Sequence, residues 1–206
     1  MSGAFPISSS KFETLGIKSI QPTLISKSIS GKKLSRTIDA QRWAFTISVI
    51  TSTRATAYGE LMAFIVKQRS GKENFTVVPP EIEDARGSET GSVLVNGAQS
   101  AGDTTIAMDA FAGDGSGRFK MGDFIKFASH TKVYMVVSDV TSSSNAATVT
   151  IEPPLVADIA NDSAVTYDDV AFTVHLTNDV QEFGIVGVDK DGANLYKYEF
   201  DVEETL

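Results

Sequence analysis

Alternating apolar and polar positions dominate the first part of the chain. Residues 15–20 and 24–29 each alternate, and residues 38–50 contain Trp43, Phe45, Ile47 and Val49 at every second position. Successive side chains of a strand point to opposite faces of a sheet, so this pattern is typical of half-buried strands. We therefore expect three strands here, with Trp43 as a core anchor of their sheet.

Residues 53–69 change to a helical period. Ser52 or Thr53 can cap the first turn with its hydroxyl, and Gly71 can supply a left-handed stop after the last turn. The pattern predicts one helix that lies on the sheet. Its buried stripe consists of Ala57, Leu61, Phe64, Ile65 and Gln68.

The β pattern of this base stops at Pro79 and Pro80 and resumes near residue 170. Short apolar runs separated by Gly, Ser and Asn turns fill the interval, at a spacing of about ten residues that is typical of a small barrel or sandwich. We expect strands at residues 93–95, 104–108, 123–128, 132–137, 147–151 and 164–167. Five strands of an oligonucleotide/oligosaccharide-binding (OB) type of barrel would fit the length.

The last part of the chain returns to the pattern of the base. Residues 172–176, 182–188 and 195–202 read as strands, and residues 189–192 form a hairpin turn with Gly192 at the position that needs a positive φ. The predicted fold is mainly β with one helix. It has a β-sandwich or barrel-like base domain, residues 1–85 and 169–206, and an inserted OB-like β-barrel, residues 90–168.

Composition narrows the chemistry. The 206 residues include no cysteine, which excludes disulfides and thiolate metal sites. No run approaches the ~18 apolar residues of a membrane-spanning helix, and no signal-peptide core is present, so we expect a protein made and kept soluble.

Charge divides the chain. Residues 1–80 carry 11 Lys and Arg against 4 Asp and Glu, a net +7, whereas residues 81–206 carry 7 against 22, a net −15. Solvated faces are the ordinary explanation. Complementary faces that meet between copies are a second. Nucleic-acid binding is disfavoured, because no stacking aromatic residues interleave with the basic ones.

No catalytic constellation stands out. His130 and His175 are the only histidines, and neither lies in a triad or zinc pattern. The Gly-rich residues 113–117 lack the Lys-Ser/Thr of a phosphate loop. We therefore predict no catalytic, cofactor-binding or metal-binding residues and no enzyme. A hydrolase that uses paired carboxylates is the least favoured of three hypotheses, and the other two follow below.

Three stretches, residues 68–71, 120–136 and 177–183, resemble virion structural proteins of tailed bacteriophages, and in particular the distal tail family of the baseplate hub or tail tip. The resemblance implies a sheet-plus-helix domain that builds a ring, of six copies in that family, at the end of the tail tube. It also implies a barrel-like domain that projects outward. The implied partners are the tail tube protein and tail-tip or hub proteins, in a virion assembled in the host cytoplasm. The family carries no catalytic residues.

In a ring, each copy meets its two neighbours through different surfaces, and opposite charges on these surfaces would set the direction and register of the contact. We expect Lys32, Lys33, Arg36 and Arg42 to meet acidic C-terminal residues of a neighbouring copy. The alternative function is recognition of a host-surface glycan by the inserted barrel, as a binding module of a tail or of another virion structural protein. Its candidate contacts, expected to be exposed, are Phe111, His130 and Tyr134.

Overall fold

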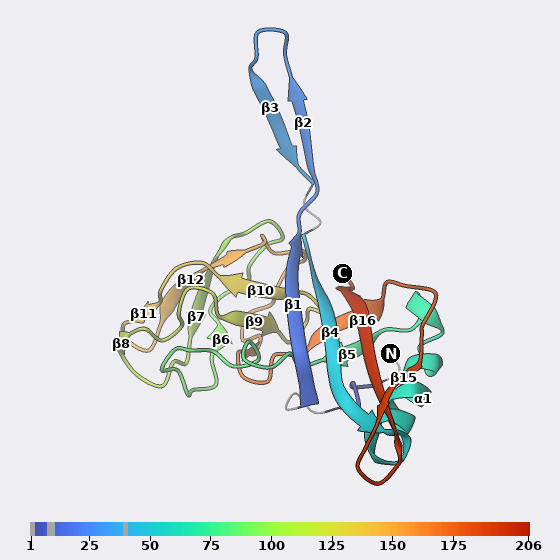
Figure 1. The fold of residues 1–206 in the computed structure, drawn as a ribbon. Helices are drawn as coiled ribbons and strands as arrows, with labels where there is room; N and C mark the ends of the chain where they lie inside the picture. Colours follow the sequence, from blue (N-terminus) through green and yellow to red (C-terminus); the bar gives the residue numbers. More distant parts are fainter. Residues whose placement is uncertain (1–2, 8–10, 39–40) are drawn as a thin grey trace. The chain divides into compact units, whose positions relative to one another are not determined.

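The computed structural model describes residues 3–7, 11–38 and 41–206 (Figure 1). The chain divides into two compact units. Unit 1 comprises Met1–Ile20, Arg42–Pro80 and Ala171–Leu206, and unit 2 comprises Gln21–Gln41 and Glu81–Val170. The predicted class is confirmed, because the described residues are mainly strand and contain a single α-helix.

Unit 1 is built on one antiparallel sheet. Its strands, in spatial order, are β1 (Phe12–Ile20), β4 (Arg42–Thr53), β16 (Asn194–Glu204), β14 (Phe172–Leu176) and β5 (Phe75–Val77). A further strand, β15 (Gly184–Val188), pairs with β16 alone. The hairpin turn predicted between β15 and β16 is confirmed: Gly192 has a φ of +84°, and Asp189 Oδ1 accepts the backbone N–H groups of Asp191 and Ala193.

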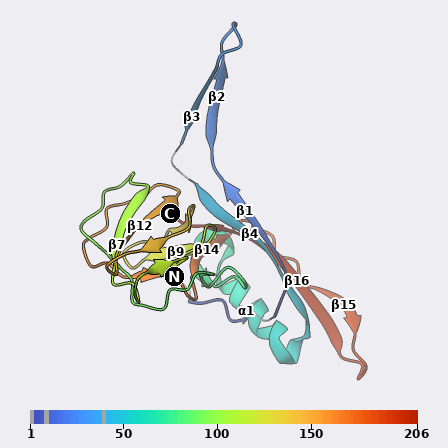
Figure 2. The ribbon, with the colours of Figure 1, turned by 90° about the vertical axis from the view of Figure 1, so that its left-hand side faces the viewer.

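The helix of unit 1 lies on this sheet (Figure 2). A π-helical turn, η2 (Arg54–Tyr58), leads into α1 (Gly59–Lys67). Four residues of the predicted stripe are buried and Phe64 is half-buried. Phe64 meets Phe75 of β5 with ring centroids 5.3 Å apart, and Tyr58 stacks on Tyr196 of β16 at 4.6 Å.

Both ends of the helix differ from the prediction. Thr53 occupies the N-cap position but makes no capping hydrogen bond with its side chain. The left-handed residues after the helix are Arg69 and Ser70, not Gly71. Gly71 is needed for close approach instead, because a Cβ there would lie 2.6 Å from the carbonyl oxygen of Leu176.

Alternate positions of β4 contribute to the core of unit 1, together with buried residues of the helix and of β5, β14 and β16. Phe45, Ile47 and Val49 are buried, and Phe45 packs on Phe172 of β14 with centroids 4.9 Å apart. Trp43 is 6 % exposed, which confirms it as a core residue. β4 starts at Arg42 rather than at residue 38, and residues 39 and 40 of the predicted strand lie outside the described residues.

The Glu81–Val170 part of unit 2 is a nearly closed, barrel-like sheet of six strands. Its order is β13 (Val165–Thr166), β9 (Phe124–Phe127), β10 (Val133–Val136), β12 (Ala147–Glu152), β7 (Thr105–Asp109) and β6 (Leu94–Val95). A bridge between Leu94 and Ala164 brings the last strand back to the first. Val165 N and Val95 N donate there to Val93 and Ser163 carbonyls, each at 3.0 Å.

These six strands are the six that the sequence predicted for the insert. The OB type itself remains a prediction. A two-stranded pair, β8 (Gly115–Ser116) with β11 (Thr141–Ser142), was not predicted, because two-residue strands leave no periodicity to detect. The barrel interior is apolar and aromatic, with Phe119, Phe127 and Ile106 at 0 % exposure. Full burial of one such side chain contributes about 1.5–3 kcal/mol.

The Gln21–Gln41 part of unit 2 is a separate two-stranded hairpin, β2 (Thr23–Lys27) and β3 (Lys33–Thr37). Its tip is a β-turn in which Gly31 N donates to Ser28 O at 2.9 Å, with Gly31 at a φ of +81°. The predicted strand 24–29 corresponds to β2. All ten residues of the two strands are exposed.

Candidate functional site

The three ring-bearing residues predicted to be exposed on the barrel are buried. Phe111 is 3 %, His130 is 7 % and Tyr134 is 0 % exposed. Phe111 packs on Phe119 with ring centroids 5.7 Å apart, and Tyr134 packs on Phe127 at 5.4 Å. The predicted exposure is therefore wrong, because these large rings contribute more to the barrel core than they would at a solvated surface. No sugar ring can stack on them there.

His130 belongs to a buried chain of hydrogen bonds. Its Nδ1 lies 2.8 Å from the Tyr134 hydroxyl, whose oxygen also accepts the backbone N–H of Val156 at 3.2 Å. Burial lowers the pKa of His130, and a backbone hydrogen bond with Asp158 opposes this shift. The barrel thus favours the neutral imidazole, which holds the β9–β10 connection in place.

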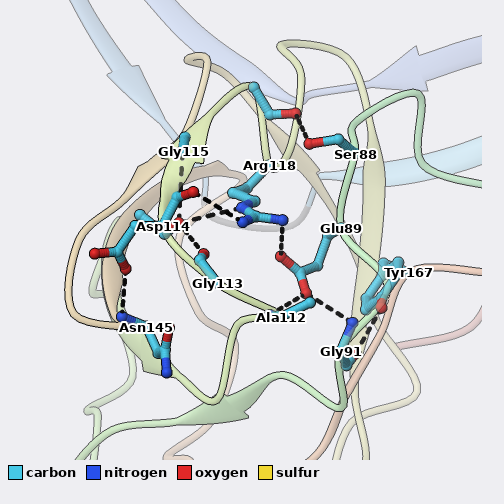
Figure 3. A network of polar contacts seen from close by, with 12 residues as sticks. Ser88, Glu89, Gly91, Ala112, Gly113, Asp114, Gly115, Arg118, Asn145 and Tyr167 are labelled. Atoms are coloured by element: carbon cyan, nitrogen blue, oxygen red, sulfur yellow. Dashed lines mark hydrogen bonds and ion pairs between the residues drawn. The ribbon is translucent and has the colours of Figure 1, made fainter.

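A second polar network surrounds the buried carboxylate of Glu89 (Figure 3). Oε1 accepts the backbone N–H groups of Gly91 and Ala112, both at 2.7 Å. Oε2 lies 3.7 Å from the guanidinium of Arg118. The Tyr167 hydroxyl donates to the Gly91 carbonyl at 2.5 Å. Backbone donors and one guanidinium together compensate a charge that would otherwise be costly to bury.

Arg118 connects this carboxylate to the Gly-rich loop, residues 113–117 (Figure 3). Its Nε donates to Ser142 Oγ at 3.2 Å, and its Nη2 donates to the Asp114 carbonyl at 3.1 Å. Ser142 Oγ in turn donates to the Gly113 carbonyl at 2.6 Å. The loop directs the Asp114 carbonyl at the Arg118 guanidinium, whereas a phosphate site needs backbone N–H donors that point at the ligand. Its arrangement is that of a structural loop.

The first and last segments of the barrel pair with each other. Ala85 N donates to Tyr167 O and Val170 N donates to Glu83 O, both at 2.9 Å. Carboxylates crowd this pairing. Burial, and then repulsion from neighbouring carboxylates, raises the pKa of Glu83 and likewise that of Asp168. A raised pKa means that these two carboxyl groups take up protons more readily than exposed ones, and protonation removes the repulsion.

A shallow pocket of about 320 Å³ lies beside these segments. It is lined by Glu81, Ile82, Asp84, Arg86, Gly122 and Asp123. The Asp123 carboxylate already accepts the backbone N–H groups of Arg86 and Lys120, so these bonds use its oxygens within the fold. Within residues 3–7, 11–38 and 41–206, no group of three His, Asp or Glu side chains could hold a metal ion. In the same ranges, no helix is long and apolar enough to cross a membrane.

Three of the four predicted intersubunit residues lie together on the β2–β3 hairpin. Lys33 and Arg36 belong to β3, and Lys32 precedes it in the turn. All three are exposed. Their contact with another copy remains a prediction.

Arg42, the fourth, lies at the start of β4 and has a partner within its own chain. Its Nε is 2.9 Å from Glu203 Oε1 on the neighbouring strand β16. Glu203, one of the acidic C-terminal residues, thus pairs with Arg42 within the same chain. A contact of Arg42 between copies also remains a prediction.

Sequence reasoning missed a second exposed region, on and beside β15. Val180, Ile185, Val186 and Val188 are between 57 and 75 % exposed. Acidic residues flank them, at Asp179, Glu182, Asp189 and Asp191. The available signal was a strand-like apolar run bounded by acids on both sides, which alternation alone does not distinguish from a core strand.

One comparison with known proteins identifies the barrel. Residues 83–170 match the family model described as distal tail protein pb9, B domain. The matched stretch spans all six barrel strands and the paired segments at its two ends. No curated protein matches the chain. The match confirms the resemblance to distal tail proteins of tailed bacteriophages and indicates a structural role in a phage tail.

Proposed function

We propose that this chain forms a closed ring, of six copies, at the distal end of a phage tail tube. There it connects the tube to the proteins of the tail tip or baseplate. The observation that carries the proposal is the match of residues 83–170 to a distal tail protein domain. In this proposal residues 1–85 and 169–206 build the ring, and the OB-like barrel of residues 90–168 offers its surface to tip proteins. The subunits assemble in the host cytoplasm and remain in the virion.

Electrostatics supports assembly from identical copies. Residues 1–80 carry a net +7 and residues 81–206 a net −15, and the exposed β2–β3 hairpin carries four of the positive charges. In a cyclic assembly each copy meets its neighbours through two different surfaces, so complementary charge fixes direction and register. Lys32, Lys33 and Arg36 are the proposed basic contacts.

Glycan recognition by the barrel has no comparable support. It depended on Phe111 and Tyr134, whose rings lie in the barrel core. A non-enzymatic role also agrees with the match, since the matched family is a structural component of phage tails. We therefore propose no second function.

Native mass spectrometry of the full chain, followed by negative-stain imaging, tests the ring. A single closed assembly of six copies is the expected result. Raising the ionic strength should shift the mass towards the monomer, because exposed charge pairs are screened beyond a Debye length of about 8–10 Å. A chain that stays monomeric even with purified tail tube protein would contradict the proposal. Antibody labelling of virions gives an independent test, with label expected only at the tail end.

A further inference from the structure

We propose that the β2–β3 hairpin of one copy docks on the β15 region of a second copy of this chain. This inference rests on the proposed ring and assigns the two surfaces that meet in it. The basic hairpin is defined as residues 21–38, and the acidic edge as residues 177–194. The two surfaces match in charge and in apolar character.

The basic hairpin lacks a hydrophobic core of its own. Every residue of β2 and β3 is exposed, including Leu24 at 61 % and Leu34 at 58 %. An isolated two-stranded hairpin is marginally stable in water, and it gains independent stability when a third strand or another element covers one face. The aliphatic side chains on these strands therefore indicate a covering partner.

The register of the hairpin places both of its leucines on one face, and Ile25 lies on the other face. Leu24 lies opposite Arg36, and Ser26 lies opposite Leu34. Residues directly opposite share a face of the ribbon, so both leucines and the guanidinium point to the same side. That face can bury aliphatic surface while its cation meets a carboxylate at the rim.

The other face carries an unfavourable charge pair. Lys27 lies directly opposite Lys33, and like charges in such a cross-strand pair are destabilising. The basic hairpin contains four Lys and Arg and no Asp or Glu. Among the described residues of the chain, none of these four side chains forms an ion pair. Carboxylates from another molecule would relieve the repulsion.

The tip of the hairpin is ordered for contact. Ser28 Oγ lies 2.8 Å from Ser30 Oγ and accepts the backbone N–H of Lys32 at 3.1 Å. Ile29, held within this turn, is fully exposed. A rigid turn that presents a β-branched aliphatic side chain loses little conformational entropy when the side chain is covered.

The acidic edge has the complementary composition. It contains Asp179, Glu182, Asp189 and Asp191 against one cation, Lys190. Its exposed aliphatic residues are Val180, Ile185, Val186 and Val188. A net −3 therefore faces a net +4, and each surface adds aliphatic side chains that need cover. An anionic membrane or a nucleic acid would match the charge of the hairpin, but nothing in either matches β15.

The backbone of β15 also has room for a neighbour. A Cβ at Gly184 or Gly187 would meet no atom within 4 Å, so the fold of this chain does not require glycine there. Glycine within a strand often marks a place where another backbone approaches closely. The register shift between Ile185 and Gly187 leaves Val186 as an extra residue, so we assign the contact to side-chain packing rather than to an added strand.

The basic hairpin of one copy would meet the acidic edge of the next, which is a head-to-tail contact. Repeated head-to-tail contacts form a closed ring when the rotation between neighbouring copies divides a full turn evenly. A second copy is therefore the occupant that explains both surfaces together. The chain has no cysteine, which permits a direct test with introduced thiols on a clean background.

The test mixes two single variants of the full chain under mild oxidation. One carries Leu34→Cys on the basic hairpin, and the other carries Ile185→Cys on β15. A disulfide needs Cα atoms about 4.4–6.8 Å apart, so efficient formation reports close contact. The mixture should give a linked dimer, and neither variant alone should. The matched control replaces Ile185→Cys with Val66→Cys, at a comparably exposed aliphatic residue of α1.

Charge reversal gives the second readout. Lys32→Glu with Lys33→Glu should lower linking and weaken association about tenfold or more, because like charges then face each other. Glu182→Lys with Asp191→Lys should restore both in the same mixture. Asp189 is left unchanged because its carboxylate accepts the N–H groups that order the turn. Lys67→Glu with Lys72→Glu, the same charge change elsewhere, should have little effect.

The outcomes separate the two proposals. A closed ring whose Leu34→Cys and Ile185→Cys copies link no better than the Val66→Cys control would overturn this inference and leave the proposed function standing. The variants could instead link specifically and show charge rescue, while the antibody fails to label the tail end of virions. That result would support the interface and overturn the proposed function. Absence of both linking and assembly overturns the inference, and labelling of virions then decides the function separately.

Discussion

Two hairpins of this chain, β2–β3 and β9–β10, share a local topology and differ in what stabilises them. Both join antiparallel strands through a short turn. In β9 and β10 only Lys126 and Met135 are half-buried, and the other six residues are buried. In β2 and β3 every residue is exposed. A tight turn brings two strands together in both places, but only one hairpin buries its side chains within the chain.

The difference shows that the formation of a hairpin and its contribution to stability have separate causes. Turn chemistry and alternation determine that a hairpin forms, whereas the covering surface determines what it contributes to stability. The barrel hairpin stabilises its own unit. The exposed hairpin has side chains suited to burial, and none of its ten strand residues is buried by the part of the chain that the structure describes. Its contribution is therefore expected in an assembly. Four predictions test this contrast.

The largest effect is expected in the barrel core. Phe127→Ala should lower the free energy of unfolding by about 3–5 kcal/mol, because it removes a fully buried ring of β9 and leaves a cavity. Denaturant unfolding of the full chain, followed for the barrel, measures the change. Phe127→Leu is the control and should cost markedly less. Equal effects for the two variants would mean that the ring is not tightly packed.

The next effect comes from the network in Figure 3. Arg118→Met keeps the apolar stem of the side chain but leaves the buried Glu89 carboxylate without its cation. We expect a loss of about 3 kcal/mol, since an uncompensated buried charge is strongly destabilising. The double variant with Glu89→Gln should recover part of that loss. Additive losses in the double variant would contradict the coupling of the two side chains.

Acid should weaken the barrel through His130. Its pKa is lowered in the folded chain, so below about pH 6.5 the unfolded chain binds a proton that the folded chain does not. The free energy of unfolding should therefore fall from about pH 6.5 downward, until the lowered folded pKa is reached. Urea unfolding at a series of pH values measures the slope.

His130→Gln serves as the reference for this measurement, because the amide cannot take up the proton. The raised pKa values of Glu83 and Asp168 act in the opposite direction, since protonation favours the folded form, and they remain in both proteins. The difference between the two slopes isolates the imidazole. Parallel curves would show that His130 is not protonated preferentially on unfolding.

The smallest effect on the isolated chain is expected in the exposed hairpin. Leu34→Ala should change the free energy of unfolding by less than about 0.5 kcal/mol, as for other exposed positions. Its effect should instead show in assembly, as a lower fraction of oligomer at equal protein concentration in analytical ultracentrifugation. A large loss of monomer stability would show that the hairpin is covered within its own chain.

The strands of the barrel could be predicted because each has an apolar run bounded by turn residues. β7 and β12 alternate clearly, and Ile106 and Val149 point into the core as expected. β3 could not be predicted, since its five residues contain a single apolar side chain, Leu34. It forms a strand because β2 supplies a partner and the turn at Gly31 sets the register.

The candidate site could be predicted only in part. Charge alone identified Lys32, Lys33 and Arg36, and the structure places them on one hairpin. The exposure expected for Tyr134 was wrong, because the sequence does not reveal that His130 and the N–H of Val156 supply polar partners for its hydroxyl inside the barrel. The exposure of the aliphatic side chains of β15 could not be predicted either. It depends on which elements pack against this strand in the folded sheet, and the local sequence does not show that.

Residues 81–170 begin and end beside segments that are already paired. In unit 1, Val77 of β5 lies opposite Phe172 of β14, so the base sheet is already joined where residues 81–170 depart. In unit 2, the first and last segments are hydrogen-bonded to each other between Ala85 and Tyr167. Replacing residues 81–170 would therefore leave no strand of the base sheet without its neighbour, because Val77 and Phe172 pair independently of what lies between them in the sequence.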